Sequence, residues 1–197
     1  MFSFSRPSDS QIRQFLARAA DSEYTYSEVG ATSGLLPPLF TIDHNRVVLG
    51  EGLPTWNAAV AALRQWRMFE LGWVQLCYPT TSIAAGQVVG VLAHALGCYW
   101  LNACRIVYLI DEDGPVKRFG FAYGTLEDHA ESGEERFLIE WNRDTDAVSY
   151  DIVAFSRPHQ FLSRIGYPIA RRLQKRFAAG SKAVMLRAVA EGSSTRS

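Results

Sequence analysis

The chain has 197 residues, of which 20 are basic and 20 acidic, so its formal net charge is zero. A neutral chain offers no overall field to attract nucleic acid or an anionic membrane surface, and neither is expected as a partner. Apolar residues make up 48% and charged residues 20%, which excludes a disordered chain and indicates one globular domain. No apolar stretch reaches the roughly 18 residues of a membrane span, and the N-terminus does not resemble a signal peptide. We therefore expect a cytoplasmic protein without stable membrane insertion.

The three cysteines, Cys77, Cys98 and Cys104, are odd in number and lie in apolar surroundings without a Cys-x-x-Cys pair. Such cysteines are typical of reduced, buried small side chains in a cytoplasmic protein. A catalytic thiol is the alternative interpretation.

A helix is expected close to the N-terminus. Ser8 followed by Gln11 has the spacing of a capping box, and apolar residues then repeat at helical intervals, which predicts a helix over residues 8–21. Glycine and proline interrupt residues 22–39, which should form an irregular link.

A strand and a second helix follow. Residues 40–49 divide into two alternating faces, which predicts a strand. Pro54 suits the first turn of a helix, and an apolar side that continues to about residue 69 predicts that this helix stops at Gly72.

Residues 73–155 are expected to form most of a sheet. Runs rich in valine, isoleucine and aromatic residues are separated by turn signals, such as the acidic Gly-Pro turn at 111–115. The predicted strands cover residues 73–78, 87–96, 99–111, 118–126, 134–141 and 148–155. Short turns join successive strands, which predicts an antiparallel sheet.

The last element is predicted to be a long helix that begins directly after the sheet, with Ser156 as its cap and Pro158 in its first turn. Pro168 should bend this helix. Its apolar stripe is formed by Leu162, Ile165, Ile169, Leu173 and Phe177. Residues 1–190 then form one domain, and residues 191–197 form a flexible tail.

This order of elements predicts an α+β fold in which a curved antiparallel sheet wraps around the C-terminal helix. The apolar stripe of the helix must be buried, and the concave face of the sheet is the natural place for it. One helix does not fill such a face along its whole length, so an internal cavity is expected. The 12% of aromatic residues would supply suitable walls.

Several short segments carry a resemblance to known proteins. They are Asp43–Arg46, Gly50–Gly52, Asn102–Tyr108, Phe119–Thr125, Gly133–Phe137, Tyr150–Ile152 and the closing stretch 155–177. The closing stretch and the order of elements resemble the helix-grip fold of START-like proteins and polyketide cyclases. The other segments resemble an uncharacterised bacterial family, the domain of unknown function nineteen-ninety, over nearly the whole chain. This resemblance implies the fold and leaves the function to be argued from residues.

His44 and Arg46 are the first candidates for chemistry, because they share one face of the strand over residues 40–49 with apolar residues. Polar groups on an apolar face are costly unless they have partners. In the functional interpretation this face is a pocket wall, where His44 exchanges a proton and Arg46 holds an oxygen or a carboxylate. The alternatives are a face turned to solvent and a purely structural set of hydrogen bonds.

Asn102 and Arg105 lie in the strand over residues 99–111. An arginine in the middle of a strand should be paired with a carboxylate, and Glu135 and Glu140 are the available partners. The pair is either a structural ion pair or a ligand anchor at the floor of the cavity.

Tyr123 follows two phenylalanines on one face of its strand, where it either donates a proton to a ligand or only packs. The opposite face carries Gly120, Ala122 and Gly124, which is bare enough for the close approach of a helix or a ligand.

His129 lies in an acidic loop, but its spacing from the carboxylates matches no zinc pattern, so we expect no metal. An acid/base role at the mouth of the cavity is one interpretation, and a solvated loop is the other. No glycine-rich nucleotide motif and no Gly-x-Ser-x-Gly occur, so catalysis should need no cofactor.

Two functions from different classes remain open. The first is an enzyme, a cofactor-free cyclase, dehydratase or isomerase that folds an apolar polyketide-like or lipid-like substrate and moves protons, for example in cyclic or spiro acetal formation. Its catalytic residues would be His44, Tyr123, His129 and Glu135, and its ligand-binding residues Arg46, Asn102 and Arg105. The second is a carrier or sensor of a hydrophobic metabolite, and a protein-interaction scaffold with a filled core is a third possibility. The oligomeric state does not follow from the sequence.

Overall fold

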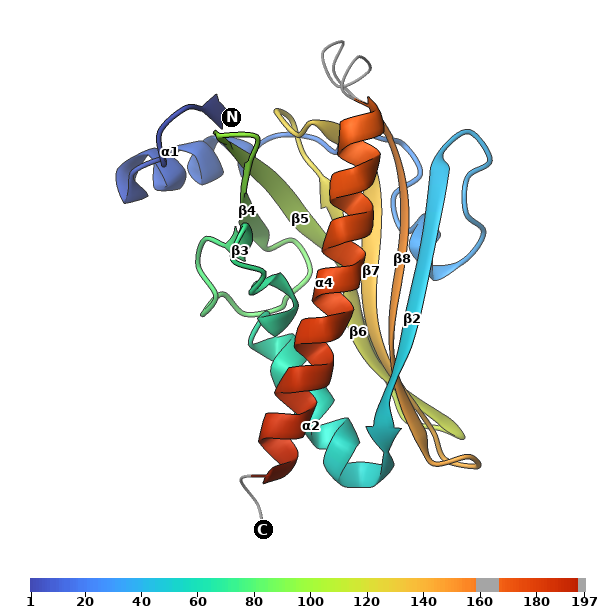
Figure 1. The fold of residues 1–197 in the computed structure, drawn as a ribbon. Coiled ribbons are helices and arrows are strands. Elements are labelled where there is room, and N and C mark those ends of the chain that lie inside the picture. Colours follow the sequence, from blue (N-terminus) through green and yellow to red (C-terminus); the bar gives the residue numbers. More distant parts are fainter. Residues whose placement is uncertain (159–166, 195–197) are drawn as a thin grey trace.

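The computed structural model describes residues 1–158 and 167–194, and it has the expected architecture: an antiparallel sheet curls around a long C-terminal helix (Figure 1). The strands are β1 (Phe2–Ser3), β2 (Thr41–Glu51), β3 (Val74–Leu76), β4 (Val88–Ala95), β5 (Cys98–Glu112), β6 (Val116–Thr125), β7 (Glu131–Asn142) and β8 (Ala147–Pro158). Their order across the sheet is β2-β8-β7-β6-β5-β4-β3, and the short β1 pairs with β5. The first strand of the large sheet in sequence, β2, therefore lies beside the last, β8.

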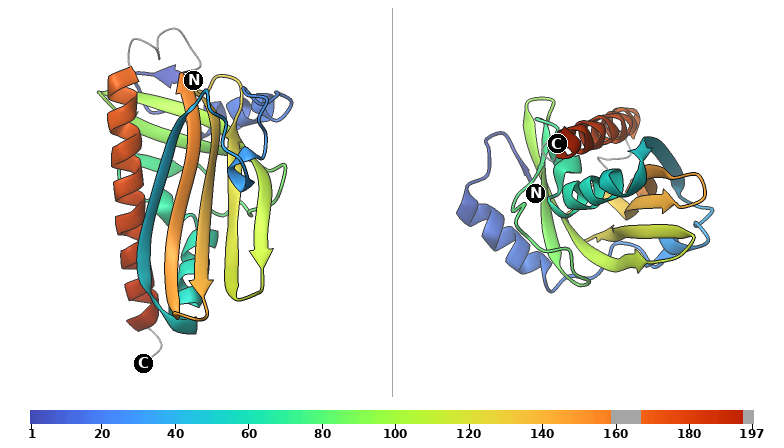
Figure 2. Two further views of the ribbon diagram at one scale, coloured as in Figure 1. Left: turned by 90° about the vertical axis from the view of Figure 1, so that its right-hand side faces the viewer. Right: turned by 90° about the horizontal axis from the view of Figure 1, so that it is seen from below.

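Two helices occupy the inside of the curl, and one lies outside it. Helix α2 (Gly52–Arg64) and helix α4 (Tyr167–Ser194) pack against each other and against the concave face, whereas α1 (Asp9–Ala19) packs on the opposite side of β4 and β5 (Figure 2). The α1 core contacts come from Ile12 and Phe15, which meet Leu92 and Leu101. Ser8 and Gln11 form the predicted capping box at the start of α1. No helix in the described part of the chain is long and apolar enough to cross a membrane.

The register of the strands decides which side chains face the inside. Phe121 lies opposite Phe137, and Phe137 lies opposite Ile152, so all three share the concave face with the core of α2 and α4. The next row toward the start of α4 is Asp43, Ala154, Glu135 and Tyr123, on β2, β8, β7 and β6. The concave face therefore changes from aromatic and aliphatic to polar along its length.

The link between α1 and β2 is fastened to the convex face by a buried carboxylate. Glu134 is only 2% exposed. It accepts hydrogen bonds from the hydroxyl of Tyr26 at 2.8 Å and from the backbone N–H groups of Gly30 at 2.7 Å and Thr32 at 3.0 Å. Gly124 is required there, because a Cβ atom would lie 2.0 Å from the Tyr26 hydroxyl. The bare strand face thus accommodates this link, where the sequence suggested a helix or a ligand.

Two predicted helix boundaries were wrong. Ser156 and Pro158 belong to β8, so Ser156 does not cap the last helix, which begins in the described chain at Tyr167. Helix α2 ends at Arg64, because Trp66 adopts a left-handed conformation with φ of 58° before a short 3-10 turn, η2 (Arg67–Phe69).

The predicted stripe on the last helix is only partly confirmed. Phe177 packs on the core, whereas Ile169 is exposed, and Leu162 and Ile165 lie outside the described residues. The inner side of α4 continues with Ser181 and Met185, both fully buried. The helix extends through Ser194, into the segment expected to be a tail. All three cysteines are free thiols, and Cys104 is buried.

Candidate functional site

Tyr123 and Glu135 form a hydrogen-bonded pair on the concave face. The two residues lie directly opposite each other on β6 and β7, and the Tyr123 hydroxyl donates to Oε2 of Glu135 at 2.8 Å. The second carboxyl oxygen, Oε1, receives no hydrogen bond from residues 1–158 or 167–194. The pair therefore leaves one oxygen of the Glu135 carboxyl group without a donor among these residues.

The surroundings bring the Glu135 carboxyl close to neutral pH. Burial raises the pKa of Glu135 to about 7, the hydrogen bond from Tyr123 acts in the opposite direction, and the nearby charge of Asp43 raises it further. Burial and the Glu135 charge hold the pKa of Tyr123 well above its usual value, so the phenol stays protonated. A carboxyl group with a pKa near 7 takes and gives protons at physiological pH, which is the property required of a general acid or base.

Aromatic rings surround the pair on the side toward α2. The ring of Phe137 lies 5.4 Å from that of Tyr123, centroid to centroid, and Phe69 lies 6.3 Å from Tyr123. Phe177 brings α4 into the same cluster, 5.4 Å from Phe69. The polar pair thus lies at the border of a dry aromatic region.

Polar groups lie on the side of the pair toward the start of α4. Arg171 donates two hydrogen bonds to Asp43, and Gln174 donates to the Ser156 hydroxyl at 3.2 Å. Glu131 is on the same strand face as Glu135, and burial raises its pKa. Both of its carboxyl oxygens are buried and lack a hydrogen-bond partner in the described part of the chain.

A hollow of about 300 Å³ adjoins the aromatic cluster. Its lining includes Trp66, Phe69 and Leu76, and Phe69 separates it from Tyr123. This volume is at the lower end of that found for small-molecule sites.

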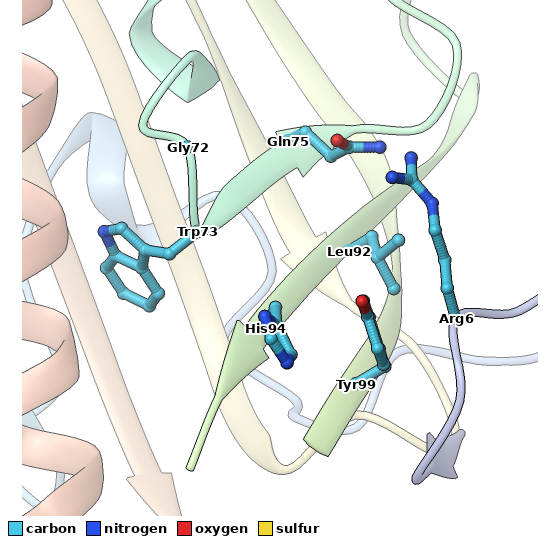
Figure 3. A pocket seen from close by; sticks show the side chains of 7 residues that line it. All are labelled: Arg6, Gly72, Trp73, Gln75, Leu92, His94 and Tyr99. Atoms are coloured by element: carbon cyan, nitrogen blue, oxygen red, sulfur yellow. The ribbon is translucent and has the colours of Figure 1, made fainter. Parts of the chain in front are cut away.

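A smaller pocket of about 90 Å³ lies between β3 and the start of the chain (Figure 3). In Figure 3 the Arg6 side chain reaches toward Gln75, beside the stacked rings of His94 and Tyr99, whose centroids are 4.3 Å apart. This pocket is too small for a lipid-like ligand.

His44 and Arg46 lie on the convex face and not beside Tyr123 and Glu135. His44 Nε2 is 2.6 Å from the buried carboxylate of Asp151, and Arg46 is bonded to Glu140. The apolar residues that share this face, Ile42 and Val48, are 45% and 60% exposed. The interpretation of this face as a pocket wall was therefore wrong, because the apolar residues mark a solvated surface.

Asn102 and Arg105 point to opposite sides of β5. Asn102 shares the inward face with Cys104, whereas Arg105 faces α1. Arg105 forms no ion pair with Glu135 or Glu140. It donates to the backbone carbonyls of Ala20 at 2.8 Å and Ser22 at 3.0 Å, at the end of α1.

His129 lies in the turn between β6 and β7, where its Nδ1 accepts a hydrogen bond from the backbone of Glu131 at 3.0 Å. The described residues contain no group of histidines, cysteines and carboxylates that could hold a metal ion. Of the seven residues predicted for the site, the structure thus brings together Tyr123 and Glu135 on the concave face and, apart from them, His44 and Arg46 at Asp151 on the convex face.

Sequence reasoning missed Asp43 and Arg171 as neighbours of the site. Asp43 alternates with His44 along β2, and only the choice of the inner face separates the two. Arg171 is one of several basic residues in the last helix, and its side chain is largely buried against Asp43. The signal for Asp43 was its place on the face shared with Val47 and Leu49, the more apolar end of that strand.

Full-length relatives occur in several organisms. A UPF0548 protein of Dictyostelium discoideum is 40% identical over 215 residues, covering 100% of this chain and 99% of its own. A UPF0548 protein of Deinococcus radiodurans is 35% identical and covers 95% of this chain and 98% of its own. A third, from Arabidopsis thaliana, is 31% identical and covers 95% and 97%. Because two of these organisms are eukaryotes, the expected restriction of the family to bacteria was wrong.

Solved structures with a similar arrangement have low sequence identity. A hypothetical protein from Helicobacter pylori, jhp0584, has a TM-score of 0.46 at 14% identity, covering 76% of this chain and 85% of its own. Human STARD10 has a TM-score of 0.40 at 11% identity, covering 91% and 81%. The family model described as a domain of unknown function (DUF1990) matches residues 25–183, and the chain belongs to this family.

Proposed function

We propose that this protein binds an apolar small molecule between the sheet and α4, and that Tyr123 and Glu135 move protons on it without a cofactor. The observation that carries the proposal is the hydrogen bond of 2.8 Å between the Tyr123 hydroxyl and a carboxyl group whose pKa is about 7. Groups that titrate near neutrality in a dry, aromatic setting are those expected of a catalytic acid/base pair.

Ring closure of a hydroxy-ketone illustrates what the pair could do. The free Oε1 of Glu135 takes the proton of the attacking hydroxyl, whose oxygen forms a bond to the carbonyl carbon. Tyr123 gives its proton to the carbonyl oxygen, which becomes the new hydroxyl group. The carboxyl group of Glu135 then turns so that its new proton faces the phenolate oxygen of Tyr123 and passes to it. Both groups are restored, so the reaction is an isomerisation and consumes nothing. Holding the flexible substrate folded against the aromatic rings would lower the entropic part of the barrier.

A carrier without turnover is the second candidate. The hollow of about 300 Å³ beside Phe69 favours it, because a hydrophobic ligand could be held there without contacting the acid/base pair. Transport or sensing requires apolar walls but gives Glu135 no reason to be buried without an ion-pair partner, since a buried carboxyl group is costly.

The test begins with native mass spectrometry of the purified protein, before and after denaturing extraction, to identify a molecule that purifies with it. Turnover of that molecule is then measured for the wild type, Tyr123→Phe and Glu135→Gln. An enzyme should lose about 10²-fold or more in kcat in both variants with little change in affinity. Glu140→Gln is the matched control, because Glu140 lies on the same strand but on the convex face, bonded to Arg46 and Arg118. Binding with no turnover in any of the proteins would instead establish the carrier.

A further inference from the structure

We propose that the ligand of the Tyr123–Glu135 site carries a protonated amine on its apolar body. This inference rests on the proposed function, since it names the class of molecule that the same site would take.

The Glu135 side chain is only partly exposed, and its carboxyl group has no counter-charge. No arginine, lysine or histidine in residues 1–158 and 167–194 lies within ion-pair distance of it. The neighbouring Asp43 is different, because Arg171 neutralises it through two hydrogen bonds. Lys182, a further cation of α4 on this side, is directed to the side-chain oxygen of Asn45 at 3.4 Å. The basic groups of α4 that face the sheet are therefore engaged elsewhere.

The other groups that face Glu135 do not supply a positive charge either. They are Tyr123 on β6, Asp43 on β2, Cys104 on β5 and Tyr150 on β8. Burial raises the pKa of Tyr123 and Tyr150, and also that of the Cys104 thiol, so these three stay neutral. The local balance around Glu135 is thus neutral to negative, which favours a cationic ligand and disfavours an anionic one.

Glu131 extends this negative lining. It lies four residues before Glu135 on the same face of β7, about 13 Å away at the usual rise of a strand. Only Gly133 stands between them on that face. Both buried oxygens of Glu131 lack a well-formed hydrogen bond in the described ranges, although the Ser156 hydroxyl and the Arg171 charge lie close enough to lower its pKa against the effect of burial. A buried polar atom without a partner in a native fold calls for an explanation, and a donor on a ligand provides one. An ammonium group, which has three donors and a positive charge, suits a carboxyl group better than a hydroxyl or a carbonyl, and Glu131 would add to the negative potential at a distance.

The aromatic side of the site favours the same class. The rings of Phe69, Phe137 and Phe177 form one cluster with Tyr123, which offers an apolar surface beside the carboxyl group. A ligand with an apolar chain and an ammonium head would place the chain against these rings and the head at Glu135. A fatty acid would instead place its carboxylate beside a carboxyl group.

The test uses three probes that differ only in the head group: decylamine, decanol and decanoate, each below its micelle-forming concentration. Their binding is measured by titration calorimetry at pH 6 and pH 8. The amine stays charged over this range, because its pKa is about 10, so a change in its affinity reports protonation of the protein, and the Glu135→Gln variant assigns that change to Glu135. Ionised Glu135 rises from about one-tenth to nine-tenths of the molecules, so decylamine should bind about tenfold more tightly at pH 8 than at pH 6. Decanol should show no such change, and decanoate should weaken.

Two comparisons assign the effect to Glu135. The Glu135→Gln variant should lose the pH dependence, whereas the Glu140→Gln control should keep it. A further measurement, which uses only the wild type, does not depend on the folding of the Glu135→Gln variant. Binding of decylamine at pH 7 should release about half a proton, which appears as a dependence of the binding heat on the ionisation heat of the buffer.

The outcomes separate this inference from the proposed function. If the amine, the alcohol and the acid bind alike at both pH values, the cationic class is wrong and the apolar site stands. If decanoate binds most tightly, the charge argument is overturned. If none of the three binds, the proposed function itself fails.

Discussion

Arg171 donates two hydrogen bonds to Asp43 and thereby connects the first turns of α4 to the edge strand β2. Both side chains are mostly buried, at 19% and 27% exposure, so the pair is less screened than a surface ion pair. The same Asp43 charge acts on Glu135, which is separated from it on the concave face only by Ala154. This contact therefore affects both the docking of the helix and the protonation of the candidate site.

Replacement of Asp43 by Asn should lower the pKa of Glu135 below about 7, because it removes a neighbouring negative charge and leaves the Arg171 guanidinium unneutralised. The free energy of unfolding should also fall, by about 1–3 kcal/mol, since a partly buried cation loses its partner. The pKa is measured by NMR titration of the glutamate carboxyl carbons. Asp144→Asn, which removes an exposed aspartate from a turn, should change neither value. A Glu135 pKa that does not move in Asp43→Asn would show that the two carboxyl groups are not coupled.

The stability of the protein should fall as the pH rises toward neutrality, because of Glu135. Its pKa is raised from 4.5 to about 7 on folding, so the folded state holds this proton more tightly than the unfolded state. Between these two values the unfolding free energy decreases with pH, and the total loss is up to about 3 kcal/mol. Urea unfolding at pH 5 and pH 8 measures it, as the difference between the wild type and Glu135→Gln. The variant should be the more stable protein at pH 8, and identical pH profiles for the two proteins would contradict the buried position of the carboxyl group.

The sheet could be predicted from the sequence because alternation is a local signal. Each predicted strand between residues 73 and 155 corresponds to an observed one, with ends that differ by a few residues. The prediction missed that β7 begins at Glu131. Its first residues are mostly polar and resemble a solvated loop, although Glu134 faces the convex side and Glu131 and Glu135 face inward. The start of the final helix was predicted too early in the chain, since Ser156 and Pro158 are as compatible with the end of a strand as with the start of a helix.

The candidate site was only half predictable, because the sequence does not say which face of a strand turns inward. Asp43 and His44 are neighbours in the chain, and both sides of β2 carry polar and apolar residues. The choice is made by long-range register: β2 pairs with β8, more than 100 residues away, and this puts Asp43 in the row of Glu135. Tyr123 follows two phenylalanines on its strand, and a strand face with three aromatic residues is a strong signal for the core, so the inward position of its ring could be predicted, whereas its role stays a prediction.

Gly124→Ala should be strongly destabilising. The added Cβ atom would lie 2.0 Å from the Tyr26 hydroxyl, so Tyr26 must move, and Glu134 then loses the hydrogen bond of 2.8 Å. Overpacking and the loss of one of the hydrogen bonds to a buried carboxylate together should reduce the free energy of unfolding by about 3 kcal/mol or more. Chemical unfolding measures this change. Gly34→Ala is the matched control, because no atom lies within 4 Å of the added group, and it should change stability by less than about 1 kcal/mol. Equal effects of the two substitutions would mean that the link over residues 22–39 does not pack on β6 as described.

Arg105→Met should loosen α1 without disturbing the sheet. Arg105 donates hydrogen bonds to the carbonyls of Ala20 and Ser22, and in this way it satisfies backbone acceptors that the end of the helix leaves unpaired. Methionine keeps an unbranched apolar stem and removes the charged donors, so the loss should be about 1–3 kcal/mol, the usual value of hydrogen bonds to a charged group.

Hydrogen exchange followed by mass spectrometry gives the location of this loss. Amides of α1 and of the residues just after it should exchange at least tenfold faster in Arg105→Met, whereas those of β6 and β7 should keep their protection. Arg18→Met is the control, because it removes an exposed arginine from the last turn of the same helix, where only the weaker interaction with the helix dipole is lost. If the amides of α1 exchange at the same rate in both variants, packing of Ile12 and Phe15 holds the helix in place and the capping by Arg105 contributes little.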